Sequence, residues 1–289
     1  MLFVQDRNYP YVYEKLETAV LYDFKINELT ELQEHIIINK YQQELEVDLT
    51  SHYTSNKVAF SVNTTNHQYL LDVSLKKQEL LIRQLNSITE NIELVIDAVG
   101  DIKKITNYEE VKEKWELLLP KLKRHHQGVL AHGYLEGIGK KIKDEKRFTV
   151  DLKQYRLFGM LFNSLLRIPF DDKSIKSRTR TFTNAIHSLP IQVTEQLVLV
   201  EEDITTNLLT YKVTGTLHAI DAETTVRINK YLRYYDIRAD LIYLENYSGY
   251  YKVNKYTAWT AEAEITCTLS NGRGYRRELH FSLKDKGYE

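Results

Sequence analysis

The sequence predicts an α+β protein in which strand-rich N-terminal and C-terminal regions flank a central helical cluster. Apolar residues alternate with polar ones in the first and last thirds of the chain, as they do in half-buried strands. In the middle third they recur every three or four residues, which is typical of amphipathic helices. Clean alternation favours antiparallel pairing with one solvated face, so each strand-rich region should form a meander, a sandwich or a partly closed barrel.

Three units are expected along the 289 residues. Residues 1–106 should form an antiparallel β region with a hairpin and one long helix at about 75–91. Residues 107–170 should form the helical cluster, and residues 171–289 an antiparallel β domain. The sequence leaves open whether the two β regions share one sheet.

The first region contains several runs in which every second residue is apolar. These residues are Val20, Tyr22, Phe24 and Ile26 in one predicted strand, Leu45, Val47 and Leu49 in a second, Val58, Phe60 and Val62 in a third, and Tyr69, Leu71 and Val73 in a fourth. The apolar spacing then changes to three or four residues between Leu81 and Ile92, which predicts a helix. Gly100 lies between two apolar runs and predicts a hairpin turn.

Helix signals mark the central segment. Asn107 is placed to cap a helix whose first turn carries Glu109 and Glu110, because a cap oxygen accepts a free backbone N–H and carboxylates suit the positive helix end. Pro120 should kink this helix, and Pro169 should end the last one.

Alternation returns in the last region and predicts seven strands separated by turn residues. The predicted strands are 179–186, 191–200, 208–217, 224–234, 238–244, 256–269 and 275–283. Asn271 and Gly272 form the strongest hairpin signal in the chain, because both residues tolerate positive φ.

The composition excludes several classes of protein. A hydrophobic share of 43% can build a core, which excludes wholesale disorder. The single cysteine, Cys267, excludes an internal disulfide framework and a cysteine-based metal cage. The nine histidines lack metal-binding spacing, and residues 133–141 depart from phosphate-loop spacing, so neither a metal nor a cofactor is expected. With no signal segment and no apolar run near the roughly 18 residues of a spanning helix, the expected location is the cytoplasm.

Tyrosine is concentrated in one stretch, with 8 of the 21 tyrosines at 231–256. Tyrosine offers a large contact area with a polar tip, which suits recognition surfaces, although it also suits half-buried sheet faces. The sequence therefore predicts a non-enzymatic interaction or structural protein, a subunit or adaptor of a larger bacterial assembly that binds a protein partner. Tyr250 and Tyr251, which follow a predicted turn at Ser248 and Gly249, should be the most exposed part of this stretch, because a turn cannot bury both. The expected partner-binding residues are Tyr234, Tyr235, Tyr247, Tyr250, Tyr251 and Trp259.

A basic segment supports a first alternative function. Residues 121–180 carry 15 Lys and Arg against 6 Asp and Glu. Such a segment would bind a nucleic acid or another polyanion, or would pair with the acidic first third of the chain. The candidate anion-binding residues are Lys121, Lys123, Arg124, Lys140, Lys143, Arg178 and Arg180.

Two further alternatives remain. The C-terminal β domain would bind a small hydrophobic ligand if its strands enclose a cavity. A hydrolase would use Asp171 or Asp172 with a histidine such as His187. The order strand, glycine turn, strand and Asn-capped helix with Trp115 resembles that of bacterial proteins without an assigned role, and this resemblance implies no activity.

Overall fold

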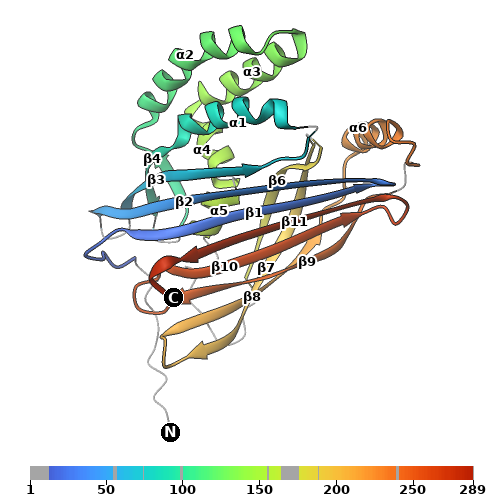
Figure 1. Cartoon of the computed structure of the whole chain (residues 1–289). Coiled ribbons are helices and arrows are strands. Elements are labelled where there is room, and N and C mark those ends of the chain that lie inside the picture. The colour runs from blue at the N-terminus through green and yellow to red at the C-terminus, as the bar shows by residue number, and fades with distance from the viewer. Residues whose placement is uncertain are drawn as a thin grey trace.

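Eleven antiparallel strands form a single sheet within the described part of the chain (Figure 1). The computed structural model describes residues 13–54, 57–73, 75–97, 100–154, 156–163, 176–187, 189–238 and 241–288. The strand order is β5-β4-β3-β2-β1-β11-β10-β9-β8-β7-β6, so two meanders meet where the first strand pairs with the last.

Each meander contributes a continuous block of strands. The N-terminal block is β1 (Val20–Leu32), β2 (His35–Thr54), β3 (Lys57–Leu70), β4 (Asn91–Asp97) and β5 (Ile102–Ile105). The C-terminal block is β6 (Lys176–Ile186), β7 (Leu189–Asp203), β8 (Leu208–Leu217), β9 (Tyr243–Asn254), β10 (Thr260–Ser270) and β11 (Tyr275–Asp285).

Within the described residues, one α-helix interrupts each block and four lie between the two blocks. They are α1 (Glu79–Asn86), α2 (Tyr108–His125), α3 (Val129–Ile142), α4 (Glu145–Gln154), α5 (Arg156–Leu161) and α6 (Ala222–Arg233). No helix in the described residues combines the length and the apolar character that crossing a membrane requires.

The expected fold class, two strand-rich regions on either side of a central helical cluster, is wrong. β1 and β11 pair from Tyr22 opposite Asp285 to Leu32 opposite Tyr275, so the two predicted β regions are halves of one sheet. The helices pack on this sheet, since α4 contacts β5 and β6 and α5 contacts β11. Periodicity reports which residues face inward, but it does not report which strand edges meet. The division into units at 1–106, 107–170 and 171–289 stays a prediction.

The sheet curls strongly around its inner face. Phe182 of β6 and Phe281 of β11 are separated by four intervening strands, yet their ring centroids are 6.1 Å apart. In a flat sheet, five spacings of about 4.8 Å would hold them about 24 Å apart. Leu157, Phe158, Met160 and Leu161 of α5 lie in the core. Phe162, which follows α5, packs with its ring centroid 5.2 Å from that of Phe60 of β3.

α6 lies where the sequence predicts a strand at residues 224–234, so that prediction is wrong. The β-branched residues at its start favour a strand locally. However, Asp221 caps the helix by accepting the backbone N–H of Thr224 at 2.8 Å. Ile228 and Leu232, four residues apart, are both buried, so packing and capping override the local preference.

β9 runs through Gly249, where the sequence predicts a turn. A Cβ at this position would lie 2.0 Å from the carbonyl oxygen of Glu264 on β10, so close approach of two backbones requires the glycine. Because neighbouring strand residues face opposite sides, Tyr251 is fully buried while Tyr250 stays partly exposed. The predicted turn at Ser248 and Gly249 is therefore wrong, and of the two tyrosines only Tyr250 is partly exposed.

The glycine-rich segment 133–141 lies within α3 and packs against α2. A Cβ at Gly139 would lie 3.1 Å from Nε1 of Trp115, so the glycine lets the two helices approach closely. Trp115 is fully buried at this contact. Helix packing thus accounts for the glycine at position 139.

Candidate ligand-binding cavity

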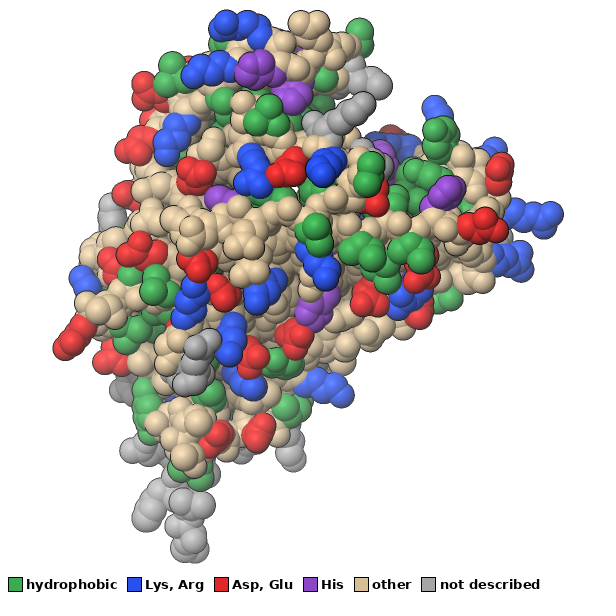
Figure 2. Space-filling model, viewed as in Figure 1, with side chains coloured by type: hydrophobic (Ala, Val, Ile, Leu, Met, Phe, Trp, Pro, Cys, Tyr) green, Lys and Arg blue, Asp and Glu red, His purple; other side chains and the backbone are tan. Residues whose placement is uncertain are grey.

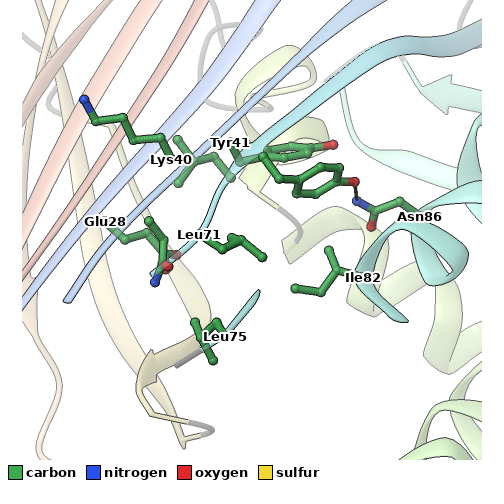
Figure 3. Close-up of a pocket in the computed structure, with 10 residues that line it drawn as sticks. Glu28, Lys40, Tyr41, Leu71, Leu75, Ile82 and Asn86 are labelled. Carbon is green, nitrogen blue, oxygen red and sulfur yellow. Dashed lines mark hydrogen bonds between the residues drawn. The ribbon is translucent and has the colours of Figure 1, made fainter. Parts of the chain in front are cut away.

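A cavity of about 220 Å³ lies between α1 and the inner face of β1, β2 and β3 (Figure 3). Cross-strand pairing builds its floor in two rows that run perpendicular to the strands. The first row is Ile26, Tyr41 and Tyr69, and the second is Glu28 and Asn39. Leu71, the residue after β3, also lines the cavity.

α1 and the segment before it form the roof. Leu75, Ile82 and Asn86 line the cavity from this side, and the amine of Lys40 points away from it (Figure 3). α1 is shorter than the helix expected at about 75–91, because 3₁₀ turns at Lys76–Gln78 and Ser87–Thr89 flank it. No residue of α1 is fully buried, so the helix covers the cavity without forming part of a dense core.

One wall of the cavity is aromatic and is held by hydrogen bonds. The rings of Tyr41 and Tyr69 lie 5.0 Å apart. The Tyr41 hydroxyl is 2.9 Å from Nδ1 of His67, and Nδ2 of Asn86 donates to the Tyr69 hydroxyl at 2.7 Å. The guanidinium of Arg83 lies 4.5 Å over the Tyr69 ring. These contacts fix the orientation of both tyrosine rings.

Apart from Arg83, the titratable groups of this wall carry no charge near neutral pH. Burial lowers the pKa of His67, a shift that Glu90 opposes and Arg83 reinforces. Burial also raises the pKa of the Tyr69 hydroxyl. His67 and Tyr69 are therefore neutral near pH 7, which suits an uncharged ligand surface.

Polar groups lie along one edge of the floor. The Glu28 carboxylate is 3.4 Å from Nη2 of Arg277, and the side chains are 20% and 12% exposed. Asn39 Oδ1 accepts the backbone N–H of Asp72 at 3.0 Å. An apolar cavity with a few placed polar groups is the usual form of a small-molecule site.

The lining offers binding contacts without a nucleophile–base pair. Among the described residues that line the cavity, none is Ser, Thr, Cys or His. The alternative prediction from the sequence is a hydrophobic-ligand site in the C-terminal β domain. This cavity lies instead on the N-terminal strands.

A buried ion cluster lies elsewhere on the inner face. Glu195 is 0% exposed, and its Oε2 is 3.1 Å from Nε of Arg178 and 3.3 Å from Nε of Arg180. Its Oε1 accepts the Tyr247 hydroxyl at 3.0 Å, and Arg180 donates to the Gly159 carbonyl of α5 at 2.8 Å. Burial alone would raise the pKa of Glu195, but the two guanidinium groups outweigh it and lower the pKa. The cluster connects α5 to β6, β7 and β9.

The expected partner-binding tyrosines do not form one surface. Tyr247, Tyr251 and Trp259 are buried, Tyr235 and Tyr250 are half-buried, and Tyr234 is 83% exposed. A role in partner binding stays a prediction, and in this conformation only the exposed members are available for it.

The candidate anion-binding residues also separate into groups. Lys121, Lys123 and Arg124 lie at the end of α2, Lys140 and Lys143 at the end of α3, and Arg178 and Arg180 in β6. Arg180 is 7% exposed and engaged by Glu195. α3 holds Lys140 and Lys143 roughly 15–20 Å along its axis from the α2–α3 turn. Polyanion binding stays a prediction. The candidate residues do not form one patch in the structure.

The residues proposed for hydrolysis are only partly described. Asp171 and Asp172 lie outside the described residues. His187 lies at the β6–β7 turn, with its ring 4.7 Å from that of Tyr231. Across the described ranges, no three His, Cys, Asp or Glu side chains are grouped in a way that would hold a metal ion.

Comparisons with known proteins identify no relative. No family model and no curated protein matches the chain. Among solved structures, the chain is similar to DynF from the dynemicin biosynthesis pathway of Micromonospora chersina, at 7% identity and a TM-score of 0.19. The match covers 99% of this chain and 92% of that one. A score this low carries no argument about fold or function.

Proposed function

We propose that the protein binds a small, largely apolar ligand in the cavity between α1 and β1–β3, and that it acts by binding rather than by catalysis. The cavity lining supports this proposal, since Ile26, Leu71, Leu75 and Ile82 supply apolar contacts. Its polar groups are few: Glu28 and Asn39 lie at one edge, and the Tyr69 hydroxyl is already bonded by Asn86.

The size and wall of the cavity narrow the ligand class. An engineered cavity of about 150 Å³ holds benzene, so the volume of about 220 Å³ suits a substituted single ring or a compact bicyclic ring. Tyr41 and Tyr69 would contact such a ring edge-on or offset, as aromatic pairs prefer. A polar substituent would lie toward Glu28 and Asn39.

Native mass spectrometry of gently purified protein tests whether a ligand is carried. The expected result is a species heavier than the 34.1 kDa chain that converts to the chain mass on activation. Titration calorimetry with indole and 1-naphthol then tests the cavity directly. A clean apo mass together with no binding of either probe would overturn the proposal.

Two tryptophan substitutions locate the binding. Ile82→Trp fills the cavity from α1 and should abolish binding of both probes. Leu80→Trp introduces the same side chain on the same helix at a position that is 53% exposed and outside the lining, so it should leave binding unchanged. Equal effects of the two substitutions would argue against this cavity.

An interaction protein remains the second candidate, because Tyr234 presents a large aromatic side chain to solvent. In that proposal the protein is a cytoplasmic subunit or adaptor of a bacterial assembly. Pull-down from the native host tests it, and recovery of the protein without any partner above background would exclude it.

A further inference from the structure

A second cavity, of about 400 Å³, lies between the β6–β7 turn and α6. Figure 2 shows the surface hollowed between α6 and the region of α1–α3, with Lys or Arg and His side chains near the edge. The lining residues are His187, Leu189, Arg227, Lys230 and Tyr231.

The helix period aligns three of these residues toward the turn. Arg227, Lys230 and Tyr231 are three and four residues apart, so they share one face of α6. Ile228 and Leu232 are buried beside that face and anchor the helix to the core. The cavity wall is therefore held on a packed element.

The β6–β7 turn supplies the opposite wall. Ile186 pairs with Leu189, and His187, the residue after Ile186, adopts a φ of 55°. The centroid of the His187 ring lies 4.7 Å from that of the Tyr231 ring. Leu189 is buried below them. The two rings, tilted by 41° to each other, and the leucine thus form one wall of the cavity.

The charged side chains that line the cavity are all basic. None of the lining residues is acidic, and neither Arg227 nor Lys230 forms an ion pair within the described residues. Arg277 lies near enough to lower the pKa of His187, an effect that adds to burial. The available positive charges favour an anion, and the adjoining rings favour a flat group attached to it.

We propose that this cavity is a second binding site, which takes a small aromatic anion bearing a phosphate or a carboxylate. Arg227 and Lys230 contact the anionic group, and the ring of the ligand packs against Tyr231 and His187. The volume falls in the range of roughly 300–1,000 Å³ that small-molecule sites occupy. This site does not depend on the cavity under α1.

Titration calorimetry with 1-naphthyl phosphate and 1-naphthoate tests the proposal, with inorganic phosphate and neutral 1-naphthol as comparison probes. All titrations use the full chain carrying Ile82→Trp, so that the cavity under α1 is closed. At least one of the aromatic anions should bind about ten-fold or more tightly than inorganic phosphate and 1-naphthol, since both halves of the ligand contribute. The tighter anion identifies the preferred charged group.

Matched variants distinguish specific binding in this cavity from general electrostatic attraction to a basic surface. Arg227→Gln combined with Lys230→Gln should weaken the preferred anion about ten-fold or more, because charge-assisted contacts are lost. Arg233→Gln removes a positive charge from the same helix outside the lining and should change affinity less than about two-fold. Tyr231→Leu should weaken the aromatic anion while leaving inorganic phosphate unchanged.

Thermal unfolding of each variant checks that the fold is retained. We expect little change for the substitutions of Arg227 and Lys230, because both side chains are exposed. Absence of binding by both aromatic anions would overturn the proposal. So would equal losses in the Arg227/Lys230 double variant and in Arg233→Gln.

Discussion

The buried ion cluster and the polar edge of the cavity each depend on one charged residue at an inward-facing strand position, Glu195 and Glu28. Ile191, Val193 and Leu197 of β7 face inward and are buried, and Glu195 lies in the same phase. In β1, Glu28 lies in the same phase as the buried residues Ile26 and Leu32, and it lines one edge of the cavity. A charged residue in phase with buried ones must find a partner, because an unpaired buried charge is costly.

Replacing Glu195 with Gln should destabilise the fold by about 3–5 kcal/mol, since it leaves Arg180 buried without a counter-charge. Urea-induced unfolding followed by circular dichroism measures this change. Glu202→Gln is the matched control on the same strand. Glu202 pairs with Lys255 at 3.1 Å but is 37% exposed, so its loss should cost less than about 1 kcal/mol. Similar midpoints for the two variants would contradict a structural role of the Glu195 cluster.

At the scale of elements, α1 is a cover held by few buried contacts. Its partly buried Leu81 and Leu85 pack on the core, and Arg83 contacts the wall of the cavity. Elements with few buried contacts open at lower free energy than core strands. The polar network around His67 and Asn86 therefore contributes to how well α1 closes the cavity.

His67 makes this closure sensitive to acid. Its folded-state pKa is lowered by burial, so the stability it supports is complete above the unfolded value of about 6.5 and is lost as pH falls toward the folded value. The titration of the His67 ring protons, followed by NMR, should have its midpoint below the unfolded value of about 6.5.

His67→Gln removes this titrating group and should reduce the loss of thermal stability between about pH 7 and pH 5. His187, whose pKa is also lowered, retains a contribution of the same sign in that variant. A midpoint for His67 at or above about 6.5 would contradict the expected burial effect.

The sequence predicts individual elements where one signal dominates. The strand predicted at 208–217 coincides with β8, and the strands at 191–200 and 275–283 lie within β7 and β11, because strict alternation marks them. The prediction fails at 224–234, where capping by Asp221 and burial of Leu232 stabilise α6. The cavity under α1 was not predictable, since its floor depends on the register between β1, β2 and β3.

For the whole molecule, the pairing of β1 with β11 decides the architecture. Ion pairs across this seam, such as Arg276 with Glu31 at 3.7 Å, join partly exposed groups and contribute little. Buried neighbours such as Phe24 with Leu283 and the backbone ladder contribute more. No local pattern in the sequence reports this seam, because it joins segments about 250 residues apart.

The shared sheet and core predict one cooperative unfolding transition, and the two tryptophans allow a direct test. Trp115 reports on α2, within the unit expected at 107–170, whereas Trp259 lies in the sheet core 5.5 Å from Tyr13. Buried residues from both regions belong to one continuous cluster, so neither region should melt alone. In Trp259→Phe and in Trp115→Phe, the fluorescence midpoint of the remaining tryptophan should coincide with the circular dichroism midpoint of the same variant. Comparing two probes within each variant removes the effect of the substitution on stability. A fluorescence transition of Trp115 that separates from the dichroism transition would show that the helical segment unfolds as a unit of its own.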